Sequence, residues 1–208
     1  MTYLFPGSVL LIFCKAPIAG QVKTRLQPAL TAEQAAAAHR RLTEETLERA
    51  FQQPLCPVML CCAPDVDHAF FRQCAANYPL KITDQRGNDL GDRMHNAVVA
   101  ALSHYRQAIL IGCDCASMTA DDLRQALAVL QNGKDVVIAP AEDGGYVLIG
   151  LNTVQPILFS DMPWGSDSVM AETRRRINKA GLNMHALAQQ WDVDTIEDWM
   201  RYLNLKNT

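Results

Sequence analysis

The sequence predicts an α/β fold with a mostly parallel central sheet and helices on both faces. Residues 8–14, 109–111 and 135–139 are runs of mainly consecutive apolar residues, as expected of strands buried on both faces inside a parallel sheet. Segments with helix-capping residues separate these runs, and regular alternation of strands and helices is typical of parallel sheets. The chain has 208 residues, and we expect residues 1–208 to form one domain.

In the first half, the helix expected at residues 31–52 has the clearest start. Thr31 and Gln34 form a capping box, and alanines and leucines recur behind them at helical spacing. We expect His39 on this helix to lie at the surface. The other elements expected here are strands at 8–14, 57–62 and 80–83 and helices at 67–76 and 91–105.

In the second half, the strand at 109–111 should be central, and Thr119 with Asp122 should open the helix at 121–131. The Asp143-Gly144 pair is typical of a hairpin turn. The remaining expected elements are strands at 135–139, 146–149 and 183–187, a helix ending near 180, and a final helix capped by Thr195.

Composition argues against several function classes. Nineteen lysines and arginines stand against 22 acidic residues, for a net charge of −3, which gives no reason to expect binding to nucleic acid or an anionic membrane. The apolar run at 9–14 is too short to span a bilayer and lacks a signal-peptide pattern. We therefore expect a soluble, cytoplasmic protein.

The seven cysteines are odd in number and lie mostly in apolar runs, which favours reduced, buried thiols. Cys113 and Cys115 are a candidate pair for a soft metal. Buried thiols are the favoured interpretation, because no histidine or third cysteine lies near the pair in the sequence.

A basic loop at residues 15–26 follows the first strand. Its three cations, Lys15, Lys23 and Arg25, are well placed to bind phosphates, with a solvated surface loop as the alternative. A P-loop is excluded, because Val22 stands where the second glycine should precede the lysine.

Three other polar segments are open to two interpretations. Asp114 follows the central strand at the edge where open α/β sheets bind ligands, so it either binds a ligand or metal or caps a turn. Residues 84–94 either contact a nucleobase or form a solvated turn. Gly144 and Gly145 either let a ligand approach the backbone or belong to the hairpin.

Together, six segments resemble the nucleotide-diphospho-sugar transferase superfamily, and within it a bacterial family of radical SAM/selenodomain-associated transferases. They are residues 15–26, 89–94, 111–115, 142–146, 163–164 and 192–195. The resemblance implies a GT-A-like Rossmann-type fold. Two prolines common in the pattern are replaced by Ala116 and Ile196, which should leave those loops less stiff.

The resemblance also implies a site at the carboxyl edge of the sheet. Mg²⁺ or Mn²⁺ would bridge the donor phosphates to Asp114 and to Asp194 or Asp192, because the central strand carries no Asp-x-Asp pair. The other implied roles are phosphate binding by Lys15, Lys23 and Arg25, with Lys23 also catalytic, nucleotide binding by Asp89, Gly91 and Arg93, general-base catalysis by Asp143, and acceptor binding by Gly144, Gly145 and Trp164.

We therefore expect a glycosyltransferase-like enzyme that transfers a group from a nucleotide-diphospho-sugar to a small acceptor. The nearest alternative is a nucleotidyltransferase that modifies a phosphorylated small molecule and releases pyrophosphate. A non-catalytic nucleotide-binding module is a third possibility, and alternating strands without the six segments would equally fit a flavodoxin-like protein.

Overall fold

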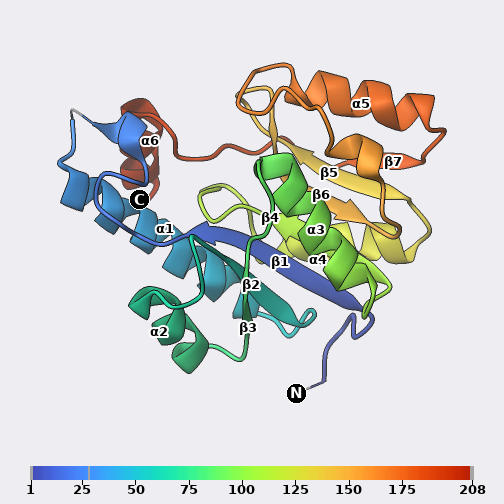
Figure 1. Cartoon of the computed structure of the whole chain (residues 1–208), viewed down its shortest axis with the longest axis horizontal. Coiled ribbons are helices and arrows are strands. Elements are labelled where there is room, and N and C mark those ends of the chain that lie inside the picture. Colours follow the sequence, from blue (N-terminus) through green and yellow to red (C-terminus); the bar gives the residue numbers. More distant parts are fainter. Residues whose placement is uncertain (1, 28, 207–208) are drawn as a thin grey trace.

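The computed structural model describes residues 2–27 and 29–206, which form a seven-stranded sheet with helices on both faces (Figure 1). The strands are β1 (Ser8–Lys15), β2 (Val58–Ala63), β3 (Lys81–Asp84), β4 (Gln107–Ile111), β5 (Val136–Pro140), β6 (Tyr146–Leu151) and β7 (Met184–Ala186). The helices are α1 (Ala32–Phe51), α2 (Ala69–Asn77), α3 (Leu90–Leu102), α4 (Ala120–Gln131), α5 (Val169–Lys179) and α6 (Ile196–Lys206), with short 3₁₀ turns η1 (Thr24–Leu26) and η2 (Pro156–Leu158).

The strand order is β3-β2-β1-β4-β6-β5-β7, and among these strands β6 alone runs antiparallel to its neighbours. The expected mostly parallel sheet is confirmed. The carboxyl ends of β1 and β4 meet at the centre of one edge, which is where α/β sheets bind ligands.

Both faces of the sheet are buried, which explains the apolar runs. On β1, Leu10 and Ile12 face a core formed with α1, α2 and α4, whereas Val9 and Leu11 face a core formed with α3 and α5. A strand covered on both sides has no solvent face and so shows no alternation of polar and apolar residues.

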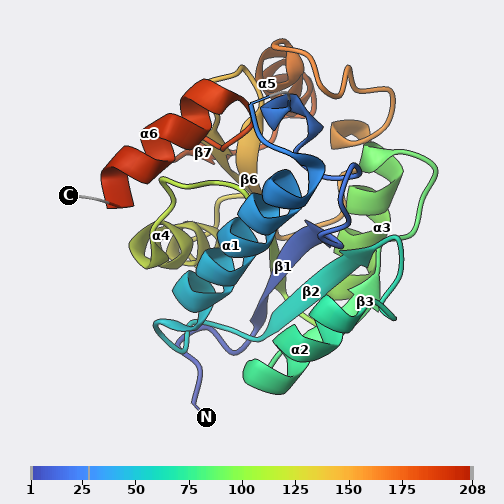
Figure 2. The ribbon, with the colours of Figure 1, turned by 90° about the vertical axis from the view of Figure 1, so that its left-hand side faces the viewer.

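The C-terminal helix α6 packs beside α1 and away from the sheet (Figure 2). Tyr202 is buried there, and its hydroxyl donates a 2.6 Å hydrogen bond to Glu45 on α1. The segment before α6 returns to the end of β4, where the amide of Val193 donates to the carbonyl of Asp114 at 3.1 Å. This return brings residues 192–194 to the central edge of the sheet.

Most expected boundaries shift by one or two residues, and two features of the structure differ further from the expectation. Helix α3 ends at Leu102, three residues before the expected 105, because the chain must turn to pair the Arg106 amide with the Gly7 carbonyl at 2.7 Å and begin β4. The β5–β6 hairpin is confirmed, but its turn is wider than two residues, since the Ala141 amide bonds to the Gly145 carbonyl.

None of the helices in residues 2–27 and 29–206 has the length and apolar character needed to cross a membrane.

Candidate functional site

A cavity of about 400 Å³ opens at the carboxyl ends of β1 and β4. It is lined by residues from β1, from the segment that follows β4, from the 15–26 loop, from α1 and from the segment before α6. Its lining residues are Phe13, Cys14, Lys15, Gln21, Val22, Lys23, Thr24, Arg25, His39, Gln85, Leu90, Gly112, Cys113, Asp114 and Asp194. The structure thus brings together five of the charged residues selected from the sequence.

Lys23 is at the centre of this group. Its Nζ lies 2.8 Å from Asp114 Oδ2 and 2.9 Å from Asp194 Oδ1, and its side chain is only 6% exposed. Its backbone is left-handed (φ 47°), as it precedes η1, a conformation that is uncommon for a lysine. In this structure the ammonium lies between Asp114 and Asp194, two of the carboxylates that the family resemblance implies as metal ligands, and does not face open solvent.

The charges of this group depend on one another. Burial opposes the charge of Lys23, but Asp114 and Asp194 outweigh it and hold the pKa of Lys23 above its usual value. Burial likewise opposes the charge of Asp114, but Lys23 holds the pKa of that carboxyl below its usual range. Lys23 and Asp114 are therefore both charged at neutral pH.

Arg25 has a different environment. Its side chain is 69% exposed, and its single ion pair within the described residues is a 3.5 Å contact with Asp194. An exposed ion pair of this length contributes little to stability. The guanidinium is therefore available to bind an anion at the mouth of the cavity.

Asp192 adds negative charge that Lys23 does not neutralise. Burial, together with the nearby Asp114, Asp194 and Asp143, raises the pKa of Asp192 to about 7. Oxygen donors with excess negative charge suit Mg²⁺ or Mn²⁺. Binding of a divalent cation by Asp114 with Asp192 or Asp194 stays a prediction, because Lys23 Nζ lies between Asp114 and Asp194 and the three carboxylates do not come within 4.8 Å of one another as a group in the described residues.

We expect Asp192→Asn to stabilise the cation-free protein at pH 8. A carboxyl whose pKa rises on folding costs stability as the pH rises from about 4, its unfolded value, through about 7, its folded value. About three pKa units correspond to about 4 kcal/mol, so the gain should approach that value at pH 8 and should vanish near pH 4. Thermal melts in a chelator measure it, and an equal gain at both pH values would contradict this explanation.

The three residues expected to bind nucleotide lie beside the cavity. Asp89 caps α3 by accepting a 2.8 Å bond from the Asp92 amide, and Gly91 is buried so tightly that a Cβ there would collide with the Phe159 carbonyl. Arg93 lines a smaller cavity, of about 220 Å³, which it shares with Lys15. Local structural roles account for Asp89 and Gly91, and a nucleotide role remains a prediction.

The four residues at the expected acceptor side lie outside the lining of the main cavity. Gly144 (φ 88°) packs against the backbone of Asp167, and the Asp143 carboxylate accepts a 2.9 Å bond from the Gly145 amide. Trp164 packs edge-on to Tyr146, with ring centroids 6.2 Å apart. Contacts within and around the turn are sufficient to explain why residues 144 and 145 are glycines. Acceptor binding by these residues stays a prediction.

Several residues that line the cavity, His39 among them, were not selected from the sequence as site residues. The expectation that His39 is exposed is wrong, because α1 lies across the end of β1. His39 is 4% exposed, and its Nε2 donates to the Lys15 carbonyl at 2.9 Å. Its helical spacing from the buried Ala35 and Leu42 could have indicated this. Gln85 directly follows β3, and its Nε2 donates to the Cys61 carbonyl at 2.8 Å.

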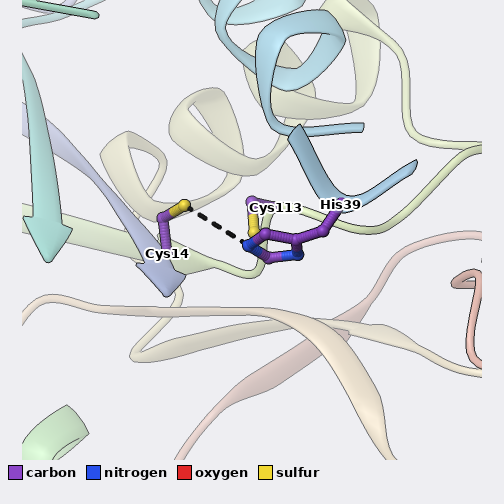
Figure 3. A group of neighbouring side chains, drawn as sticks. All are labelled: Cys14, His39 and Cys113. Carbon is purple, nitrogen blue, oxygen red and sulfur yellow. Dashed lines mark hydrogen bonds between the residues drawn. The ribbon is translucent and has the colours of Figure 1, made fainter. Parts of the chain in front are cut away.

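The cysteines are all unpaired and buried, as expected. Cys113, however, does not group with Cys115, whose sulfur lies 3.7 Å from Ser117 Oγ. The neighbours of Cys113 are instead Cys14 and His39 (Figure 3). Burial raises the pKa of Cys14, whereas a hydrogen bond with Cys14 lowers the pKa of Cys113.

Residues 46–166 match the family described as an uncharacterized protein conserved in bacteria (DUF2064), more than half of the chain. The chain belongs to this family. No protein of curated function matches its sequence.

Solved structures share the α/β fold of this DUF2064 protein. A putative nucleotide-diphospho-sugar transferase from Desulfovibrio desulfuricans G20 is 30% identical, with a TM-score of 0.87 over 98% of this chain and 89% of that chain. Two others share the fold at lower identity. CMP:2-keto-3-deoxy-manno-octonic acid synthetase complexed with CTP is 14% identical (TM-score 0.60, covering 97% and 99%). Rv0371c from Mycobacterium tuberculosis, complexed with manganese, is 15% identical (0.57, covering 96% and 99%). The expected α/β fold of the nucleotide-sugar transferase type is thus confirmed.

Proposed function

We propose that this protein is a transferase that binds a nucleotide-diphospho-sugar in the central cavity, with Mg²⁺ or Mn²⁺, and transfers the sugar to a small acceptor. The observation that supports this most directly is the meeting of the basic 15–26 loop with Asp114, Asp192 and Asp194 at one end of the sheet. Cationic side chains bind phosphate oxygens, and carboxylate oxygens are ligands that Mg²⁺ and Mn²⁺ prefer. The solved neighbours described as a putative nucleotide-diphospho-sugar transferase and as a synthetase complexed with CTP support the same class of substrate.

The phosphates and the base of the donor each have a matching surface in the cavity. Arg25 and Lys15, exposed at its mouth, bind phosphate oxygens. Leu90, which is 46% exposed, offers an apolar surface to the base. The Lys23 ammonium partly neutralises Asp114 and Asp194, and so lowers the repulsion between these two carboxylates and the incoming phosphates.

The bound divalent ion would stabilise the negative charge that builds on the leaving diphosphate. Asp143 is our candidate base for the acceptor hydroxyl, since the turn that carries it lies near Asp192. A working base contributes about 10²-fold or more, so Asp143→Asn should reduce turnover by at least that factor if the assignment is right.

Thermal melts with nucleoside triphosphates, diphosphates and nucleotide sugars, each with and without Mn²⁺, test the proposal. A ligand at about 100 times its dissociation constant stabilises a protein by about 2.7 kcal/mol, which is a shift of several degrees at this chain length. We expect a Mn²⁺-dependent shift with at least one nucleotide sugar, and no shift with any ligand would overturn the proposal.

Arg25→Met should weaken binding of the same nucleotide about tenfold, because one charge-assisted phosphate contact is lost. Arg124→Met is the matched control, since Arg124 is also exposed but pairs with Asp121 on α4, outside the cavity lining. Equal affinities for the two variants would contradict the phosphate role of the loop.

Nucleotidyl transfer is the alternative, and two further solved neighbours, described as a cytidylyltransferase from Leptospira borgpetersenii and a nucleotidyl transferase from Methanothermobacter thermautotrophicus, favour it as the second candidate. The released product separates the two reactions. A sugar transferase releases a nucleoside diphosphate, whereas a nucleotidyltransferase consumes a triphosphate and releases pyrophosphate.

A further inference from the structure

Two thiols and an imidazole come together on the floor of the cavity. Strands β1 and β4 are parallel with Ile12 beside Ile111, so the register continued by two residues brings Cys14 beside Cys113. His39 reaches them from α1, and Figure 3 shows the three side chains converging. All three are buried.

From this arrangement we propose that Cys14, His39 and Cys113 bind one zinc ion, at a site separate from the carboxylates that are predicted to bind Mg²⁺ or Mn²⁺. Two sulfurs and one nitrogen are donors that zinc prefers and that Mg²⁺ and Mn²⁺ do not. The site needs no nucleotide, so it does not depend on the proposed transferase activity.

The distances are close to those that zinc imposes. One ligand atom from each residue lies within 4.8 Å of the other two, and Cys14 Sγ is 3.9 Å from His39 Nε2. Tetrahedral zinc, with bonds of about 2.3 Å to sulfur and 2.0 Å to nitrogen, separates a sulfur from a nitrogen by about 3.6 Å and two sulfurs by about 3.8 Å. Small side-chain movements therefore suffice.

Binding requires a defined change in protonation. Both thiols lose their protons to solvent, and the ring proton moves from Nε2 to Nδ1, so the imidazole remains neutral. Nε2 then gives up its bond to the Lys15 carbonyl. Nδ1 is buried and without a hydrogen-bond partner in the described part of the chain, so no neighbouring donor opposes its taking the proton.

The fourth coordination position would face the cavity, because all three residues line it. Three protein ligands and one open position are typical of catalytic zinc, whereas structural zinc sites are closed by four. Asp114 directly follows Cys113, so a molecule held by the carboxylates and the basic loop would lie next to the open position. Water occupies that position in the absence of such a molecule.

Cobalt(II) is the probe for this site, because its thiolate charge-transfer and ligand-field absorption report sulfur ligands and tetrahedral geometry. We expect the reduced, chelator-treated full chain to bind one equivalent of Co²⁺ with a thiolate band, and one equivalent of Zn²⁺ to remove that band. Cys14→Ala, Cys113→Ala and His39→Gln should each weaken binding at least about 100-fold, because removing a ligand costs more than disturbing its outer shell.

Two variants serve as controls. Cys115→Ala removes an equally buried thiol two residues from Cys113, and Asp194→Asn removes a carboxylate of the proposed divalent-cation site. Both should bind Co²⁺ within about threefold of the unmodified chain. If a cysteine variant does not fold, His39→Gln, which keeps both thiols, provides the test.

The proposal is overturned if the reduced chain shows no thiolate band with Co²⁺. It is also overturned if Cys115→Ala abolishes the band, or if Asp194→Asn does so, because the ion would then be bound elsewhere. A nucleotide-dependent thermal shift without a cobalt band would leave the transferase proposal standing and remove the zinc site alone.

Discussion

Replacing Lys23 with methionine is expected to lower the free energy of unfolding by about 2 kcal/mol and the melting temperature by about 6 °C. The change leaves Asp114 and Asp194 facing each other without the ammonium that lies 2.8 and 2.9 Å from them. Breaking a fully buried pair costs more, about 3–5 kcal/mol. The smaller value is expected because Asp114 is 31% exposed and water screens part of its charge.

Arg25→Met is the matched control for stability, because it also removes a cation near Asp194 but one that is largely exposed. It should change stability by less than about 0.5 kcal/mol. The double variant Lys23→Met with Asp114→Asn should recover part of the loss, since the unpaired charge is gone. A loss for Lys23→Met no larger than the control's would mean that the ammonium does not stabilise this edge of the sheet.

Divalent cations give this prediction a second readout. In the unmodified chain Lys23 Nζ lies between two of the proposed cation ligands, so the ammonium and the ion compete for the same oxygens. Mn²⁺ should therefore raise the melting temperature of Lys23→Met more than that of the unmodified chain.

Asp194→Asn is expected to have the largest effect on activity. It removes one of the carboxylates that are predicted to bind the divalent ion, and the loss of several kcal/mol of transition-state stabilisation corresponds to about 10³-fold in turnover. Cation affinity should fall at least about 100-fold. Turnover with the donor identified by thermal melts, measured over a range of Mn²⁺ concentrations, provides the test.

Asp121→Asn is the control, because Asp121 is an exposed aspartate paired only with Arg124 among the described ion pairs. It should leave turnover and cation dependence unchanged. If Asp194→Asn keeps turnover within about tenfold at every Mn²⁺ concentration, Asp194 is not a cation ligand, and Asp192 becomes the partner of Asp114.

Much of the fold follows from local signals in the sequence. The apolar run that became β1 and the capping boxes of α1 and α4 are determined by neighbouring residues, and the structure contains all three. Alternation of strands and helices gave the mostly parallel sheet. The basic loop and Asp114 were identified because each follows a buried strand, and their place at the carboxyl edge follows from parallel strands alone.

The sequence by itself therefore determined the elements, the type of sheet and the edge that carries the charged residues. Only the tertiary structure decided which side chains meet. Lys23 contacts Asp114 and Asp194 across 91 and 171 residues, and Cys14, His39 and Cys113 come from a strand, a helix and the loop after β4. Such contacts depend on strand order, on register and on the path of the chain back from α6, and these are fixed by packing of the whole core, because no local propensity specifies them.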